Sequence, residues 1–278
     1  MTTLVLGGTG FIGSHLVGRL DAPRVFSRKR ADFSNYRAVD KAVEGCEVVY
    51  HLINGIFPHS NDARYGLDVN VGNTVNLLNA CVDNEVRKVV FTSSGGTVYG
   101  QTGWFSANES DPTDPISFYG VTKLAIEKYL HAYYVQFGLE YCILRIANAY
   151  GPGQVEGIIP RLFHCAMTGE AFELWGDGSV MRDYVYVDDV VDALIEARNQ
   201  EGVFNIGTGV GVTIRELIER VERLTRKPIN LNVSLGRKVD VPANVLDFSK
   251  ALRTFRWAPK TLLADGLKKT YEAILCSE

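Results

Sequence analysis

Short apolar runs alternate with amphipathic stretches through the first half of the chain. The runs with the length and composition of buried strands are Leu4–Leu6, Arg24–Phe26, Val48–Leu52, Lys88–Phe91 and Tyr141–Leu144. Between them lie segments with helical periodicity, at Phe11–Leu20, Asn70–Val82 and Tyr119–Phe137. Strands that alternate with helices form βαβ units with right-handed crossovers. The pattern therefore predicts an α/β fold built on a doubly wound parallel sheet.

The pattern becomes less regular after the turn signal Gly151-Pro152-Gly153. Thr213 and Glu216 have the spacing of a capping box, so a helix is expected from there to about Leu224. The other elements expected in this half are a helix over Asp188–Arg198, a buried strand over Val203–Gly207 and short helices near Phe248–Thr254 and Thr261–Ile274. We expect a Rossmann domain made of residues 1–148 and 183–208. A smaller C-terminal α/β substrate-binding domain would contain residues 149–182 and 209–278.

Composition and charge argue against several classes of protein. Of the 278 residues, 46% are hydrophobic and 22% are charged, and the net charge is −3, so neither nucleic acid nor an anionic membrane is indicated as a partner. No apolar run reaches about 18 residues and no basic segment precedes the first strand. We therefore expect a cytoplasmic protein without a signal peptide or membrane span. The five cysteines are scattered without a CxxC pair, so neither disulfides nor a metal site are expected.

The strongest local motif is a glycine-rich turn that follows the first strand directly and opens a helix. In this context Gly7 permits the tight turn, Gly10 lets the backbone approach a pyrophosphate, and Gly13 lets the helix pack against the strand. The N–H groups at the start of the helix attract the negative charge of the pyrophosphate. We expect a dinucleotide here, bound by Gly7, Gly10, Phe11, Ile12 and Gly13.

The end of the second strand distinguishes NAD from NADP. An NAD enzyme usually has an Asp or Glu there, which accepts hydrogen bonds from the ribose 2′-OH. This chain has Ser27 instead, followed by the cations Arg28-Lys29-Arg30. An acid would repel a 2′-phosphate, whereas an arginine binds one with two hydrogen bonds. We therefore expect NADP(H), bound by Ser27 and Arg28, with NAD as the second choice if Asp32 serves as the ribose acid.

Tyr119 and Lys123 lie four residues apart and therefore on one face of the third helix. A phenol normally has a pKa of about 10, but an ammonium group and a positively charged nicotinamide ring both favour the phenolate. Tyr119 is therefore a candidate acid/base. The strand that begins at Val89 ends in Ser93, Ser94 and two glycines, and ligands of open α/β sheets lie at such carboxyl ends.

The motifs of this chain, taken in order, resemble those of the UDP-galactose 4-epimerase branch of the extended short-chain dehydrogenases/reductases. They are GGTGFIG, SSGGTVYG, YGVTK, RIANAYGPGQ, WGDGSVMRDYVYVDDV and FNIGTG, and the resemblance extends over nearly the whole chain. It implies that Tyr119 is the catalytic base, that Lys123 orients the nicotinamide ribose and that Ser94 is the catalytic hydroxyl. One extra residue separates Ser94 from Val98-Tyr99-Gly100, so Ser93 is the alternative. Further cofactor contacts are implied at Asp32, Phe33, Leu52, Asn70 and Thr92.

The resemblance also implies residues that bind the diphosphate and ribose of a nucleotide sugar. Asn148 and Arg182 match residues that contact the diphosphate, and Arg237 matches an arginine that binds phosphate. Asp240 matches the acid that contacts the nucleoside ribose. The physical chemistry agrees, because the fork of an arginine suits a dianionic diphosphate.

The family carries out hydride chemistry at C4 of a nucleotide-linked hexose, and three reactions compete. Dehydration is set aside, because the resembling dehydratases have Asp-Glu where this chain has Gly96-Thr97. Because Ser27 and Arg28 favour exchangeable NADPH, we expect first an NADPH-dependent 4-keto-6-deoxyhexose reductase. The alternative is a nucleotide-sugar 4-epimerase of the UDP-glucose/UDP-galactose type. A non-catalytic NADP-binding regulator is less well supported, because the chain keeps both the Tyr/Lys pair and the candidate sugar-binding arginines.

A homodimer is also expected. The segments Asn70–Val82 and Tyr119–Phe137 both carry apolar stripes, and in the resembling enzymes the equivalent helices pair across a two-fold axis.

Overall fold

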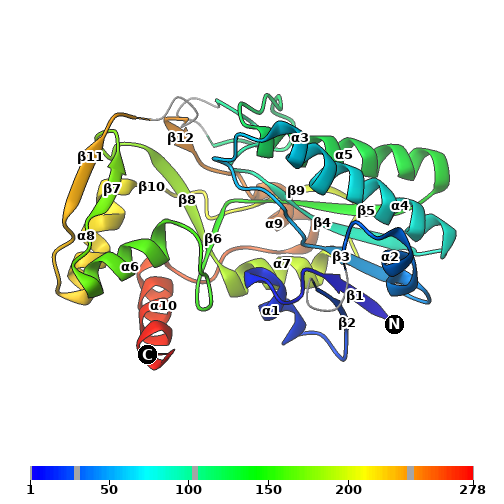
Figure 1. Cartoon of the computed structure of the whole chain (residues 1–278), viewed down its shortest axis with the longest axis horizontal. Coiled ribbons are helices and arrows are strands. Elements are labelled where there is room, and N and C mark those ends of the chain that lie inside the picture. Colours follow the sequence, from blue (N-terminus) through cyan, green and yellow to red (C-terminus); the bar gives the residue numbers. More distant parts are fainter. Residues whose placement is uncertain (1, 28–31, 102–105, 237–240, 278) are drawn as a thin grey trace.

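A six-stranded parallel sheet forms the centre of the larger part of the molecule (Figure 1). The computed structural model describes residues 2–27, 32–101, 106–236 and 241–277. The strands of the large sheet, in spatial order, are β2 (Arg24–Phe26), β1 (Thr3–Leu6), β3 (Val48–His51), β4 (Lys88–Ser94), β5 (Glu140–Ile146) and β9 (Gly202–Ile206). The order changes direction between β1 and β3, which is the doubly wound arrangement of a Rossmann fold. The predicted fold class is confirmed.

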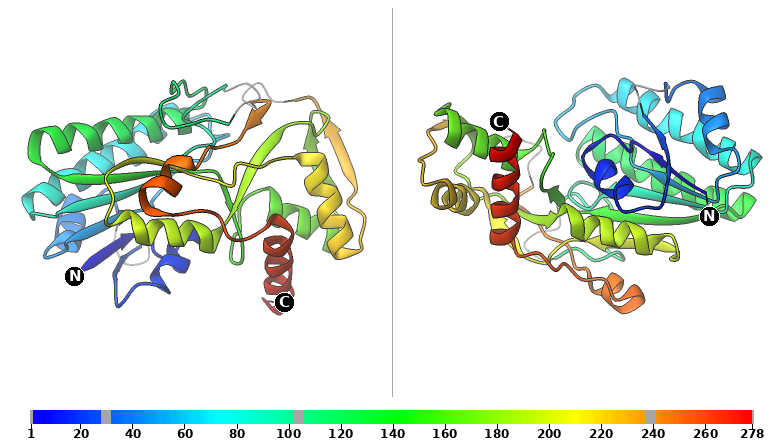
Figure 2. Two further views of the ribbon diagram at one scale, coloured as in Figure 1. Left: turned by 180° about the vertical axis from the view of Figure 1, so that it is seen from behind. Right: turned by 90° about the horizontal axis from the view of Figure 1, so that it is seen from below.

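Helices cover both faces of this sheet (Figures 1 and 2). One face carries α2 (Tyr36–Val43), α4 (Asn73–Asp83) and α5 (Phe118–Phe137), and the other carries α1 (Phe11–Val17) and α7 (Val187–Ala197). Alternate residues of each strand point to opposite faces of the sheet. Leu4 and Leu6 pack with the first set of helices, whereas Val5 packs with the second. Burial on both faces explains why the strands read as continuous apolar runs.

The smaller part of the molecule has two small sheets and its own apolar core. The strands are β6 (Asn148–Tyr150), β8 (Met181–Tyr186), β10 (Gly211–Thr213) and β12 (Ala243–Asn244) in one sheet, and β7 (Phe172–Trp175) and β11 (Leu231–Ser234) in the other. Helices α6 (Ile158–Thr168), α8 (Ile214–Thr225) and α10 (Leu263–Ser277) pack around this core, whereas α9 (Ser249–Phe255) packs on β9 of the large sheet. Strand β8 crosses the expected domain boundary at residue 183, and the division into two domains stays a prediction.

Local sequence signals explain where the predicted helices agree with the structure and where they differ from it. The capping box of Thr213 and Glu216 opens α8 as predicted. The helix expected to begin at Asn70 instead starts at α3 (Ala63–Gly66) and passes through a π-helical turn, η1 (Leu67–Gly72), before α4. Such wide turns are rare and have no periodic signal in the sequence. None of the helices in the described part of the chain is long and apolar enough to cross a bilayer.

Candidate active site

The glycine-rich turn between β1 and α1 has the shape that a dinucleotide pyrophosphate requires. Gly7 has a positive φ of 83°, and a Cβ built on Gly13 would lie 2.1 Å from the carbonyl oxygen of Gly7. Neither position therefore accepts a side chain. The start of α1 at Gly10 has no side-chain cap, which leaves its first N–H groups available. The turn fits a pyrophosphate held by Gly7, Gly10, Phe11, Ile12 and Gly13.

The residues expected around the adenosine half lie beside this turn. Ser27 is buried directly after β2, and the main chain of Leu52 borders Gly7. The Asp32 carboxylate is exposed and accepts a hydrogen bond from the N–H of Ser34 at 2.9 Å. Phe33 is buried, with its ring against those of Phe26 and His51. Arg28 lies outside the described residues, so the pairing of a cation with the 2′-phosphate stays a prediction.

Tyr119 and Lys123 project from the first turns of α5 toward the end of β4. Ser117 caps this helix, because its side chain accepts a hydrogen bond from the N–H of Gly120. The buried Lys123 Nζ donates to the carbonyl oxygen of Thr92 at 2.9 Å and lies 5.6 Å from the centre of the Tyr119 ring. Thr92 therefore contacts the lysine through its main chain.

Burial shifts the pKa values of Lys123 and Tyr119 in opposite directions. It lowers the pKa of Lys123 to about 7, an effect that the negative charge of Glu127 opposes. Burial also raises the pKa of the Tyr119 phenol to about 12, and a hydrogen bond with Ser94 acts in the other direction. A positive charge brought beside the phenol would favour the phenolate.

The two candidate serines point to different sides of β4. Ser94 lines the cavity together with Tyr119. Ser93 is buried and donates from Oγ to Oε1 of Glu127 at 2.5 Å. The chain turns directly after Ser94, whose carbonyl oxygen accepts from the N–H of Val98 at 3.1 Å. The geometry thus presents Ser94, and not Ser93, to a ligand in the cavity.

Asn70 joins the loop after β3 to the catalytic helix. Its Nδ2 donates to Oγ1 of Thr122 at 3.1 Å and to Oδ1 of Asn54 at 3.2 Å. Its Oδ1 accepts from the N–H of Gly55 at 2.8 Å. Asn70 is buried within the π-helical turn, and it therefore fixes the wall of the expected nicotinamide site.

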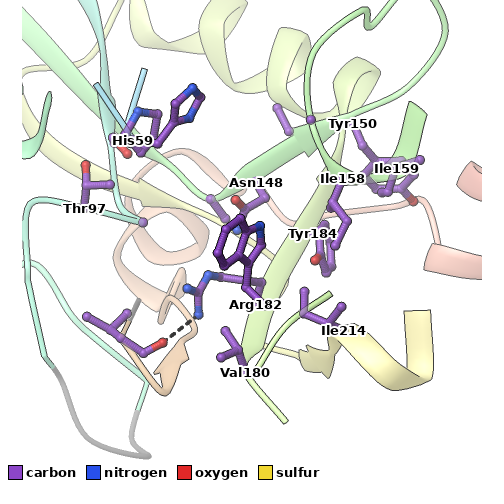
Figure 3. A pocket seen from close by; sticks show the side chains of 18 of the residues that line it. His59, Thr97, Asn148, Tyr150, Ile158, Ile159, Val180, Arg182, Tyr184 and Ile214 are labelled. Atoms are coloured by element: carbon purple, nitrogen blue, oxygen red, sulfur yellow. Dashed lines mark hydrogen bonds between the residues drawn. The ribbon is translucent and has the colours of Figure 1, made fainter. Parts of the chain in front are cut away.

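A cavity of about 600 Å³ is lined both by candidate catalytic residues and by the expected diphosphate-binding residues. Its lining includes Ser94 and Tyr119, together with Thr97, Asn148 and Arg182, and Figure 3 shows the last three around the cavity. This volume lies within the range of pockets for small-molecule ligands, about 300–1,000 Å³. One cavity therefore joins the candidate acid/base to candidate anion-binding groups.

The candidate diphosphate-binding groups Asn148 and Arg182 are held by one of the smaller sheets. Arg182 Nη1 donates to the carbonyl oxygens of Met181 at 2.8 Å and Val241 at 2.9 Å (Figure 3). Asn148 Nδ2 donates to the carbonyl oxygen of Asp183 at 3.1 Å. Arg237 and Asp240 lie outside the described residues, so their roles stay predictions.

Several residues that line the cavity had not been singled out from the sequence. They include His59 after β3, Trp175 at the end of β7 and Tyr184 in β8. Among the described residues, the buried hydroxyl groups of Thr97 and Tyr184 have no hydrogen-bond partner, which leaves them for a ligand. Thr97 and Tyr184 do lie within motifs that carried the resemblance: Thr97 follows Gly96, and Tyr184 is two residues after Arg182. Their place in these motifs was the available signal.

The sequence of this chain is similar to those of known enzymes. The sequence profile described as the NAD dependent epimerase/dehydratase family matches residues 3–207. The chain belongs to this family. It is 35% identical to a UDP-glucose 4-epimerase of Mycolicibacterium smegmatis, over 98% of both chains. It is 29% identical to a dTDP-4-dehydro-6-deoxyglucose reductase of Escherichia coli, over 98% of this chain and 97% of that one.

Solved structures agree over the full length of the chain. The UDP-glucose 4-epimerase of Thermotoga maritima, crystallised with UDP-glucose, matches with a TM-score of 0.93 and 31% identity, covering 100% of this chain and 99% of that chain. The UDP-glucose 4-epimerase of Thermus thermophilus, in complex with NAD, matches with a TM-score of 0.93 and 30% identity, covering 100% of both chains. The protein is an enzyme of NAD-dependent chemistry on nucleotide sugars.

Proposed function

We propose that this enzyme is a nucleotide-sugar 4-epimerase of the UDP-glucose/UDP-galactose type. The observation that carries the proposal is that one cavity is lined by Ser94 and Tyr119 and also by Asn148 and Arg182. The sequence alone favours a 4-keto-sugar reductase over the epimerase. The comparisons favour the epimerase, because 4-epimerases match at the higher identity and in both solved structures described above.

One group of cavity residues would bind the diphosphate, and the other would carry out proton transfer. Arg182 and Asn148 would hold the diphosphate, leaving the hexose to reach Tyr119 and Ser94. The dinucleotide, when bound, supplies a hydride acceptor and donor for C4. Tyr119 would take the proton from O4 and later return it, while the Ser94 hydroxyl donates a hydrogen bond to O4. Inversion requires attack on the opposite face of C4, so the sugar must turn over while the diphosphate stays held.

Lys123 would favour the phenolate form of Tyr119. Its ammonium group lies beside the Tyr119 ring, and the oxidised nicotinamide would add a second positive charge. A positive charge beside the phenol would lower its pKa from the value of about 12 that burial imposes. A base that is formed only when oxidised cofactor is bound suits a reaction that begins with loss of a hydride and a proton.

The experiment that tests the reaction uses the purified protein without added cofactor. We expect UDP-galactose and UDP-glucose to be interconverted, and a dinucleotide to be released only when the protein is denatured. A reductase would instead need a full equivalent of added NADPH and a 4-keto sugar. Turnover that depends on stoichiometric NADPH would overturn the epimerase proposal in favour of the reductase.

For the resident cofactor we propose NAD, with NADP as the second possibility. The family is NAD-dependent and the Thermus relative holds NAD. NADP was expected from Ser27, which lacks the charge that would repel a 2′-phosphate. Dissociation constants of the wild type for NAD and NADP test this choice of cofactor. Ser27→Asp should shift the preference further toward NAD. Tighter binding of NADP by the wild type would restore the original expectation.

We also propose a homodimer formed around α5. This helix leaves large apolar side chains exposed, with Val121 at 49% and Val135 at 67%, and Tyr65 and Leu67 beside it are each 50% exposed. Such a stripe is large for a monomer and suits a two-fold interface. Light scattering should give about twice the chain mass of 30.7 kDa. A monomer at micromolar concentration would reject the dimer.

A further inference from the structure

A buried ion pair lies one turn beyond Lys123, outside the cavity. Glu127 is on the same face of α5, and Arg145 is on β5; their side chains are 4% and 6% exposed. Arg145 Nη2 donates to Oε2 of Glu127 at 2.7 Å, and its Nε donates to Oε1 at 3.1 Å. An ion pair this deeply buried pays a large desolvation cost and is weak evidence for stability, so another role should be sought.

The pair holds the turn that carries Ser94 at both of its ends. Before the turn, Ser93 Oγ donates to Glu127, and Ser93 is the register partner of Arg145. After the turn, the Tyr99 ring lies 4.8 Å from the Arg145 guanidinium, and the Tyr99 hydroxyl donates to Asn205 at 2.7 Å. Ser94 is thereby fixed between two anchored neighbours, with its side chain at the cavity.

The same pair sets the charge around Lys123. The titratable groups that face this ammonium in the described structure are Glu127 and Tyr119 from its own helix and His51 from β3. Burial lowers the pKa of His51 to about 3, with a further lowering by Lys123, so its imidazole is neutral. Glu127, which is itself paired with Arg145 on β5, is therefore the negative charge that acts on the lysine.

We propose that Glu127, held by Arg145, is a positioning residue of the reaction that keeps Ser94 directed at Tyr119 and keeps Lys123 charged beside the phenol. The statement about the reaction rests on the proposed function, whereas the statements about Ser94 and Lys123 do not. A purely structural pair would contribute to folding and leave the ionisation of Lys123 unchanged.

The test follows Lys123 by ¹³C NMR of protein labelled at lysine Cε, with Lys123→Met identifying its signal. In Glu127→Gln the midpoint of the Lys123 titration should fall by about one pH unit or more, because the nearest negative charge is lost. Glu127→Asp keeps the charge and should stay within about half a unit of the wild type. An unchanged midpoint in Glu127→Gln would overturn the proposal.

A second variant covers the case in which Glu127→Gln leaves Arg145 unpaired and does not fold. Glu127→Gln combined with Arg145→Met removes both charges, which a buried site tolerates far better. It should still lower the Lys123 midpoint, but by less than Glu127→Gln does, because a positive charge is lost as well and Glu127 is the nearer group on the helix of Lys123. An unchanged midpoint there also contradicts the proposal. Because the titration needs no substrate, its result is independent of whether the enzyme is an epimerase.

Steady-state kinetics test whether Glu127 positions Ser94 for the reaction. With UDP-galactose as substrate, Glu127→Gln should lose kcat on the order of tenfold or more with little change in KM, and Glu127→Asp should recover most of the loss. A rise in KM with unchanged kcat would overturn the positioning role, because it would show an effect on binding instead.

Discussion

The two sides of the cavity are built in different ways. The part with Ser94 and Tyr119 comes from β4 and α5, which are regular elements that pack together in the larger part of the molecule. The part with Asn148 and Arg182 is assembled from short strands of distant segments, in which β12 pairs with β8 at Arg182 and β6 pairs with β8 from Tyr184 to Tyr186. The comparison teaches that the candidate acid/base lies on long, regular elements of the central sheet layer, whereas the candidate diphosphate-binding groups lie on short strands brought together from several segments.

The largest expected effect is on the catalytic side. Tyr119→Phe removes only the ionisable oxygen and keeps the ring, so kcat should fall by about 10²–10⁴-fold, the usual contribution of general acid–base catalysis. The dissociation constant of the nucleotide sugar should change little, because the diphosphate is held elsewhere. Steady-state rates with equilibrium binding measure both quantities. A large loss of binding in Tyr119→Phe would remove the distinction between the two sides.

On the opposite side, Arg182→Ala should show the reverse pattern. It removes a charged hydrogen-bonding group worth about 1.5–3 kcal/mol, so KM should rise roughly 10–100-fold while kcat falls less. Arg182→Lys is the matched control, because it keeps the charge without the fork and should give an intermediate KM. If kcat falls more than KM rises, Arg182 acts on the reaction and not on binding.

The sequence predicts local geometry best where that geometry depends on neighbouring residues. The turn from Gly7 to Gly13 and the pair Tyr119–Lys123 are local patterns whose geometry follows from one turn or one helix. The sequence could not choose between Ser93 and Ser94, because that choice depends on the contact between Ser93 and Glu127 across two elements.

Helix α2 and several cavity residues were not predicted from the sequence. Helix α2 has only Val39 and Val43 buried, so its apolar stripe is too narrow to recognise, although Asn35 caps it. The cavity residues Trp175 and Tyr184 come together only through the pairing of distant strands. Long-range pairing of this kind has no periodic signal in a single sequence.

A third prediction concerns pH and the catalytic side. Burial lowers the pKa of Lys123 to about 7, whereas an unfolded chain keeps this lysine protonated to about pH 10.4. Between these values the unfolded state binds more protons, so this group makes the wild type more stable as pH rises, by at most about 1.4 kcal/mol per unit. Lys123→Met should therefore be most stable relative to the wild type below pH 7, and this advantage should decline toward pH 10.

Urea unfolding at several pH values measures that difference. Lys128→Met, on the exposed side of the same helix, controls for the loss of a lysine. A difference between Lys123→Met and the wild type that does not vary with pH would contradict the burial of a titrating lysine at this site.

The smallest expected effect is on the substrate side and far from the chemistry. Thr213→Ala removes the cap of α8 and should cost about 1 kcal/mol of stability, while Glu216→Gln keeps most of the capping box. Thermal unfolding measures the loss, and kcat should not change. A fall in kcat that matches the loss of stability would show that the substrate side has to be rigid as well.

The most direct test of the division between the two sides is single-turnover hydride transfer. The absorbance of reduced nicotinamide is followed after mixing a nucleotide sugar with the holoenzyme at several substrate concentrations. We predict that Tyr119→Phe lowers the limiting rate and leaves the half-saturating concentration unchanged, whereas Arg182→Ala mainly raises the half-saturating concentration. Hydride transfer in Tyr119→Phe at the wild-type rate across neutral pH would contradict the account.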